Sequence, residues 1–235
     1  MIGNFKKSVP EGVIVSPPKK PPFVAEGVIE GFGTWTLDEA GVLSINGTGD
    51  MPHWGLSSSR PWHTIKNNIL SVRISDGITG IGDRSFEDFL NLKEVSIPDS
   101  VTGIGQSAFC CCSNLTEITL PYRLAAISAN AFYGCVNLTE ISIPDRVTII
   151  AGHTFEECHN LTQVTIHNKV LYIEMQAFKG CRKLREITVP SSVLSIGKDA
   201  FAGCFSLYKL TMPARFKRAD FETFYGCPLS LVTFY

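Results

Sequence analysis

Eight cysteines are the residues with the most obvious chemistry in this 235-residue chain. Zinc sites need close pairs of ligands, such as C-x-x-C with a second pair. Six of the cysteines instead recur singly, at positions 112, 135, 158, 181, 204 and 227. A thiol repeated every 23 residues indicates a packing position that is filled by a small hydrophobic side chain. We therefore predict free, buried thiols in this column and no metal or other cofactor.

Two other arrangements of the cysteines remain open. A disulfide between neighbouring copies is geometrically conceivable, but side chains in one column point the same way, which disfavours a bridge. Cys110 and Cys111 precede the column residue Cys112, and the sequence does not decide whether they are exposed. Their redox state is equally open.

The histidines and the familiar catalytic motifs offer little more chemistry. His153 and His159 flank Cys158, but no further metal ligands accompany them, so surface or capping roles are predicted. The chain has no G-x-S-x-G elbow, H-E-x-x-H, phosphate-binding loop or dinucleotide fingerprint in its required setting. Its outward polar residues are mostly repeated, whereas an active site needs one unrepeated cluster. The sequence therefore predicts no enzyme.

An internal repeat positions all of these residues. Phenylalanine recurs every 23 residues from Phe86 to Phe224, and leucine keeps the same step from Leu92 to Leu207. Each unit reads L-x-x-I-x-I-P-x-x-V-x-x-I-x-x-x-A-F-x-x-C-x-x, with an alternating strand, a proline that ends its pairing, and a short turn of helical spacing. One unit can bury its apolar side chains only by closing into a coil and stacking on its neighbours. Seven stacked coils are therefore predicted over residues 69–230.

Segments such as IPDSVTGIGQSAF and VPSSVLSIGKDAFAGC resemble the BspA-like, or treponemal-type, leucine-rich repeat family. The unit lies within the usual repeat length of about 20–29 residues, although no asparagine follows its strand. The resemblance implies a leucine-rich repeat solenoid that is mostly β, right-handed and curved, with a parallel sheet and short helical or 3-10 turns. It also implies a non-catalytic bacterial protein, secreted or surface-associated, that mediates adhesion or binding to a host or matrix protein.

The segments outside the repeat are assigned separately. Residues 1–32, which contain the Pro17–Pro22 run, are predicted to be an extended tail or linker. Residues 33–68 are predicted to be an amino-terminal cap with a β-hairpin, because solenoids need atypical terminal units. The segment TWTLDEAGVLSINGTGDM is also similar to the cap of bacterial family members. Residues 231–235 are predicted to form a final strand. No signal peptide is visible, and the resemblance implies that one was removed.

Two polar columns face outward from the predicted strands. One column contains Glu94, Glu117, Glu140, Gln163, Glu186 and Lys209. The other contains Ser96, Thr119, Ser142, Thr165, Thr188 and Thr211. Like charges stacked at strand spacing repel, so the glutamates favour an acidic face for a protein partner with a basic surface. The alternative is a solvated sheet edge without function, where screening keeps the repulsion small.

The overall composition excludes some partners and leaves two further functions open. A net charge of -1 disfavours nucleic acid and anionic membrane surfaces. No apolar run approaches the roughly 18 residues of a membrane span. We expect a monomer. The chain could also be a structural spacer or targeting module of a larger surface protein, or it could bind carbohydrate at the cap through Trp54 and Trp62.

Overall fold

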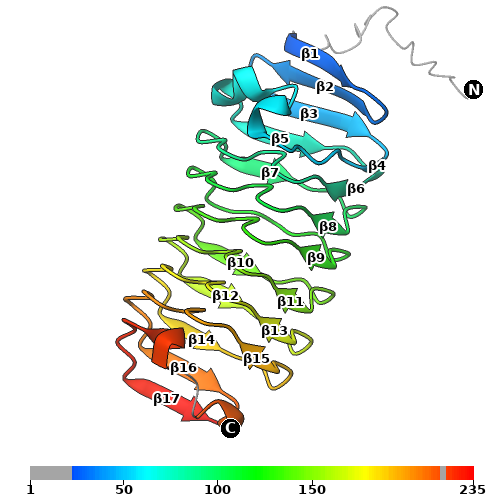
Figure 1. Cartoon of the computed structure of the whole chain (residues 1–235). Helices are drawn as coiled ribbons and strands as arrows, with labels where there is room; N and C mark the ends of the chain where they lie inside the picture. The colour runs from blue at the N-terminus through cyan, green and yellow to red at the C-terminus, as the bar shows by residue number, and fades with distance from the viewer. Residues whose placement is uncertain (1–22, 218–220) are drawn as a thin grey trace, which may run out of the picture.

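The computed structural model describes residues 23–217 and 221–235. These residues form a solenoid of stacked coils with an antiparallel cap at its amino-terminal end (Figure 1). Corresponding strands of successive coils lie 23 residues apart and pair in parallel, as Glu140–Ser142 does with Gln163–Thr165. The predicted fold class is therefore confirmed.

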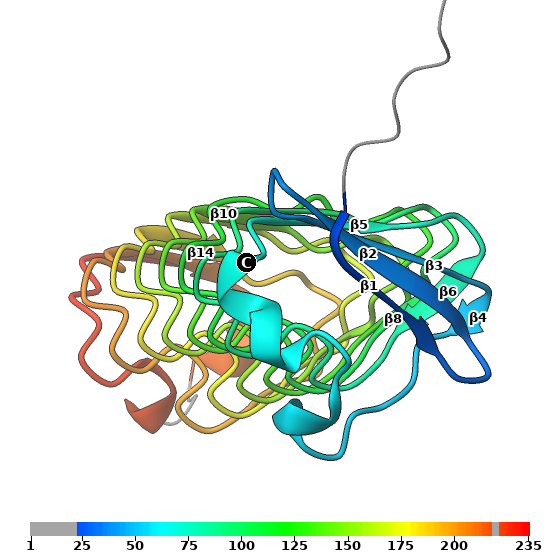
Figure 2. The same ribbon diagram turned by 90° about the horizontal axis from the view of Figure 1, so that it is seen from above.

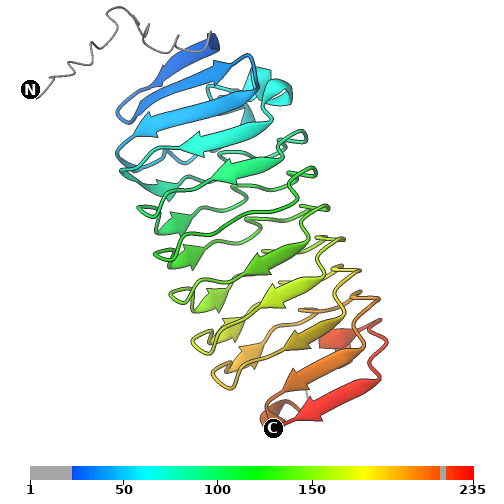
Figure 3. The same cartoon turned by 180° about the vertical axis from the view of Figure 1, so that it is seen from behind.

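The strands run along two sides of the stack, as Figures 1 and 3 show. We call one series the front sheet: β5 Ser71–Ile74, β7 Glu94–Ser96, β10 Glu140–Ser142, β12 Gln163–Thr165, β14 Glu186–Thr188, β16 Lys209–Met212 and β17 Leu231–Phe234. We call the other the back sheet: β4 Gly49–Asp50, β6 Ile78–Ile81, β8 Gly103–Ile104, β9 Ala126–Ile127, β11 Ile149–Ile150, β13 Tyr172–Ile173 and β15 Ser195–Ile196. Four short 3-10 helices complete the elements of the described residues: η1 Ser57–Ser59, η2 His63–Asn68, η3 Ala214–Phe216 and η4 Phe221–Phe224.

The cap consists of three antiparallel strands that lie across the end of the stack (Figure 2). They are β1 Phe23–Ile29, β2 Gly33–Asp38 and β3 Val42–Gly47, and β3 continues into the solenoid by pairing in parallel with β5. The predicted hairpin is β2 and β3. The predicted linker, residues 1–32, extends too far, because residues 23–29 form β1. Gly27 allows this pairing, since a Cβ there would lie 2.6 Å from Trp35 Nε1. The proline-rich residues 17–22 lie outside the described part of the chain.

A ladder of phenylalanine rings runs through the core. Rings of successive coils are stacked, with centroids 5.2–5.6 Å apart from Phe86 to Phe224. The ladder starts in the cap, where the Trp62 ring stacks on Phe86 at 6.0 Å. The rings from Phe86 to Phe201 are fully buried. Offset stacking of this kind adds about 0.5–1.5 kcal/mol per pair to the hydrophobic burial of each ring.

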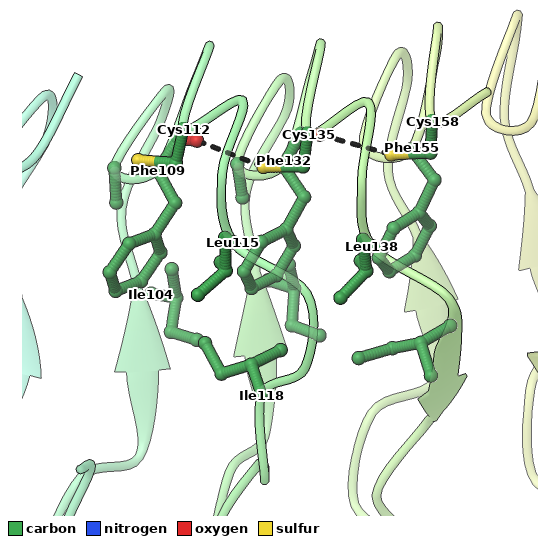
Figure 4. Packing of buried hydrophobic residues seen from close by; sticks show 14 of the residues in the cluster. Ile104, Phe109, Cys112, Leu115, Ile118, Phe132, Cys135, Leu138, Phe155 and Cys158 are labelled. Atoms are coloured by element: carbon green, nitrogen blue, oxygen red, sulfur yellow. Dashed lines mark hydrogen bonds between the residues drawn. The ribbon is translucent and has the colours of Figure 1, made fainter. Parts of the chain in front are cut away.

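The column cysteines lie beside this ladder as free thiols, as predicted. Each one donates its S–H to the carbonyl of a phenylalanine in the preceding coil; Figure 4 shows two of these bonds. Cys135 reaches the Phe109 carbonyl at 3.2 Å and Cys158 reaches the Phe132 carbonyl at 3.3 Å. Burial raises the pKa of both thiols, so they stay protonated and remain donors. These carbonyls also accept a backbone N–H, as Phe132 does from Cys135 at 3.2 Å, so the repeated cysteine adds a second hydrogen bond between coils besides filling space.

In six of the coils, the backbone around A-F-x-x-C passes twice through the left-handed region. At the first position stand six non-glycine residues with φ of 55–60°: Arg84, Ser107, Asn130, His153, Gln176 and Asp199. The second position holds glycine in four coils and Asp88, Cys111 or Glu157 in the other three. This conformation aims the backbone N–H along the stack: Cys111 donates to the Tyr133 carbonyl at 2.7 Å and Glu157 to the Lys179 carbonyl at 2.8 Å. These hydrogen bonds join neighbouring coils where no sheet is present.

The front sheet is interrupted, which the repeat did not predict. Within the described residues, the third coil forms no strand at 117–119, and the hydrogen-bonded ladder also stops between β12 and β14. Glu117 lies between Glu94 and Glu140 in the column, so like charges would stand directly opposite each other on both sides. Charge alone does not explain the interruptions, because Gln163 and Glu186 at the second break are not a like-charge pair.

Candidate binding surface on the front sheet

The predicted polar columns lie on the solvent side of the front sheet. All ten of these side chains are exposed: Glu94, Ser96, Glu117, Thr119, Glu140, Ser142, Gln163, Thr165, Glu186 and Thr188. The strands place equivalent residues side by side, as Glu140 with Gln163 and Ser142 with Thr165. The inward residues between them are buried, for example Ile141 at 3% exposure, except Val164, which is partly buried. The columns therefore form one continuous polar strip.

The acidic character of this strip is confined to its first half. Glu94, Glu117 and Glu140 follow one another, and then Gln163 interrupts the charges. Further along, Lys209 Nζ lies 2.6 Å from Glu186 Oε2, and this contact raises the pKa of the lysine. Glu186 is thus paired within the chain, and the first three glutamates are the carboxylates that remain for a partner.

Three shallow hollows follow the strip. The largest, 760 Å³, is lined by Thr119, Glu140, Ser142, Gln163 and Thr165 among others. A second of 570 Å³ touches Ser96 and Thr119. A third of 620 Å³ touches Gln163, Thr165, Glu186 and Thr188. The first two hollows adjoin the third coil, which forms no strand, so the surface is hollowed where the front sheet is interrupted.

A basic column borders the same hollow, and the sequence analysis missed it. Arg123, Arg146 and Lys169 recur at the 23-residue step, and all three are exposed. Arg146 and Lys169 line the 760 Å³ hollow opposite Glu140. Lys169 Nζ also contacts Asp145 at 3.2 Å. The repeat period alone would have revealed this column, because its residues lie two positions after Pro121, Pro144 and His167, which are equivalent positions in successive coils.

An aromatic side chain completes the rim. Tyr122 is 60% exposed and lines two of the hollows. Its hydroxyl accepts a hydrogen bond from Arg123 Nε at 3.0 Å, and the guanidinium lies 5.6 Å from the ring centroid. Exposed tyrosine and arginine side chains are common anchors in protein interfaces.

The tryptophans of the cap do not form an open site. Trp62 is fully buried and donates its Nε1–H to the Ser85 carbonyl at 2.9 Å. Trp54 is half-buried, with its ring 6.0 Å from Trp62 in an edge-to-face contact. The carbohydrate site at Trp54 and Trp62 stays a prediction, and the buried Trp62 ring offers no free face on which a sugar could stack. The general need of a solenoid to cover its end explains both rings.

The histidines near Cys158 form hydrogen bonds with carboxylates of their own coil. His153 Nδ1 lies 2.6 Å from Glu156 Oε2, and His159 Nε2 lies 2.5 Å from Glu157 Oε2. Among the residues that the structure describes, no three Cys, His, Asp or Glu side chains gather as metal ligands. No helix within the described ranges is long and apolar enough to cross a lipid bilayer.

Comparison with known proteins identifies the family. Residues 64–170 and 125–235 match the model of the BspA type leucine rich repeat region, in six copies. A leucine rich cell surface protein of Faecalibacterium prausnitzii is 30% identical, with a TM-score of 0.62 over 80% of this chain and 54% of that chain. A leucine-rich repeat protein of Bacteroides ovatus is 26% identical, with a TM-score of 0.61 over 79% of this chain and 55% of that one.

A third solved structure, the leucine rich repeat protein of Treponema pallidum, is 24% identical, with a TM-score of 0.61 over 87% of this chain and 93% of that chain. This chain thus spans about half the length of the first two structures and most of the third. No curated protein matches the sequence. Because the family model covers the whole repeat region, the chain belongs to the BspA-type leucine-rich repeat family.

Proposed function

We propose that the chain is a non-catalytic, surface-associated module that binds a protein partner through the front sheet. The observation that carries this proposal is the 760 Å³ hollow, where Glu140, Arg146 and Lys169 present both charges beside the exposed Tyr122 ring. Repeat solenoids use extended faces of this kind for binding. The description of the Faecalibacterium prausnitzii relative as a cell surface protein supports an extracellular location.

The charges define the partner's surface. The run Glu94, Glu117 and Glu140 favours a basic patch, and the column Arg123, Arg146 and Lys169 favours an acidic group beside it. A specific contact needs about 800 Å² from each protein, which is more than one hollow offers, so the partner must extend over several coils. Charged rim contacts of this kind mainly speed association and select the partner.

A binding screen with charge-reversed variants tests the proposal. Purified protein is passed over immobilised extracellular matrix and host surface proteins, and binding is measured by surface plasmon resonance at two salt concentrations. The variant Glu94→Lys/Glu117→Lys/Glu140→Lys should keep its circular dichroism spectrum and lose capture of the partner. High salt should weaken capture of the wild-type protein.

A matched control carries the same change in net charge elsewhere. Glu26, Glu30 and Glu39 are exposed in the cap, away from the hollows. Replacing these three by Lys should leave capture unchanged. Equal capture by the front-sheet variant would remove the acidic strip from the binding site. No capture by any of the three proteins would favour the spacer or targeting module.

A further inference from the structure

Cys110 and Cys111 differ from the six column cysteines. Their Sγ atoms lie 3.6 Å from each other, whereas the column thiols each bond a phenylalanine carbonyl. Both side chains are partly exposed, while Cys112, the next residue, is fully buried. The pair thus joins two thiols that are adjacent in sequence and both partly exposed.

The backbone holds the pair in place from both sides. Cys111 has a φ of 59°, and its N–H donates to the Tyr133 carbonyl at 2.7 Å. The Cys110 carbonyl accepts the N–H of Asp88 from the preceding coil at 2.8 Å. In the following coil the equivalent of Cys111 is Gly134, and a Cβ there would lie 3.3 Å from Cys111 Sγ. The glycine thus leaves room beside the sulfur.

The separation of the two sulfurs suits chelation better than a disulfide. Two thiolates bound tetrahedrally at about 2.3 Å from a metal ion are about 3.8 Å apart, close to the observed 3.6 Å. A disulfide would require the sulfurs to approach to about 2.05 Å and the Cα atoms to lie about 4.4–6.8 Å apart. Consecutive Cα atoms are only about 3.8 Å apart, so a bridge here would be strained.

We propose that Cys110 and Cys111 form a vicinal dithiol site for a thiophilic divalent ion of the Zn²⁺ and Cd²⁺ class. Each sulfur forms one bond to the ion and loses its proton to solvent, so binding one ion releases up to two protons. Water molecules complete the coordination, since the described residues offer no third ligand in a metal-binding group. Soft thiolates select such ions over Mg²⁺ and Ca²⁺.

Binding is expected to strengthen as pH rises, because the thiols must lose their protons. The ionisable groups around the pair are Glu87 and Asp88 of the preceding coil, the neighbouring Cys112, and Tyr133 and Cys135 of the following coil. The positive charge of the bound ion favours both thiolates, so the ion itself drives off the protons.

Cadmium titration of the reduced, untagged protein tests the site. The readouts are the thiolate-to-cadmium absorption in the ultraviolet and the protons released into weak buffer. One Cd²⁺ per chain is expected to bind. Cys110→Ser and Cys111→Gly should each weaken that binding more than about tenfold, because losing even an outer partner of a metal ligand costs about 10–100-fold.

Glu157→Gly is the matched control, since Glu157 occupies the same left-handed position as Cys111 in another coil. It makes the same change of backbone type and keeps both thiols, so it should bind Cd²⁺ like the wild-type protein. The site is disproved if Cys111→Gly shows wild-type absorption, if the wild-type protein shows none at equimolar Cd²⁺, or if Glu157→Gly also loses it.

Discussion

Replacing Phe155 by alanine should destabilise the stack by about 4–5 kcal/mol. The ring is fully buried between Phe132 at 5.6 Å and Phe178 at 5.4 Å. Truncation of a buried phenylalanine costs about 3–5 kcal/mol, more where the cavity cannot collapse. Here hydrogen bonds between coils fix their spacing, for example the bond from Phe155 N–H to the Ala177 carbonyl at 2.8 Å, so the coils cannot move together to fill the cavity. We therefore expect the upper part of that range.

Phe224 provides an internal comparison at the end of the ladder. Its ring stacks on one neighbour, Phe201, at 5.4 Å, and the residue is only partly buried. Phe224→Ala removes less buried apolar area and should cost about 2 kcal/mol. Phe155→Leu keeps most of the volume of the ring and should fall between the two alanine variants.

Urea unfolding measured by two probes checks these values. Circular dichroism reports the whole solenoid, whereas the three tryptophans all lie in the cap, so fluorescence reports that end. A loss of about 4–5 kcal/mol also lowers Tm by roughly 8–20 °C for a chain of this size. The reasoning is refuted if Phe155→Ala costs less than about 2 kcal/mol, or no more than Phe224→Ala.

Two predictions concern the column thiols. Cys158→Val removes one of the two hydrogen bonds to the Phe132 carbonyl, which keeps the Cys135 N–H at 3.2 Å, and should cost about 0.5–1.5 kcal/mol, whereas Cys158→Ser keeps a donor and should cost less; equal losses in urea unfolding would show that the S–H bond is unimportant. Burial raises the pKa of Cys135, Cys158 and Cys181 above the ordinary value of 9.0, so above that pH the unfolded chain loses these protons before the folded one. The free energy of unfolding should therefore be insensitive to these thiols below pH 9.0 and fall as the pH rises further. A urea midpoint that stays constant to higher pH would contradict this.

The 23-residue repeat made most of the fold predictable from sequence. Phenylalanine, leucine and cysteine columns at one period leave a stack of coils as the arrangement that buries them all. The left-handed positions were less visible, because residues as different as Arg84 and His153 occupy one of them. Their φ is imposed by hydrogen bonds to the next coil, which are tertiary interactions that no local propensity records.

The surface was only partly predictable for similar reasons. Alternation along a strand correctly predicted that Glu94 and Glu140 face outward. It did not predict the hollow between the coils, which lies beside residues 117–119, where no strand forms. We considered Trp62 as a ligand contact because tryptophan is a residue type that suits a carbohydrate site. Its ring stacks on Phe86 instead and is part of the core. Whether an aromatic residue outside the 23-residue repeat is buried depends on how the whole cap packs, and the repeat pattern does not show that packing.

The interruption of the sheets also has a mechanical consequence. Between the third and fourth coils neither the front nor the back sheet continues, since the ladders stop at β7 and β9 and resume at β10 and β11. That junction is held largely by turn bonds such as Asn130 N–H to the Gly152 carbonyl and Phe132 N–H to the Thr154 carbonyl. Each coil contacts only its neighbours, so a force applied along the stack concentrates at its weakest junction. Under tension the third and fourth coils should therefore separate first, beside the 760 Å³ hollow, while the coils on either side of this junction stay stacked.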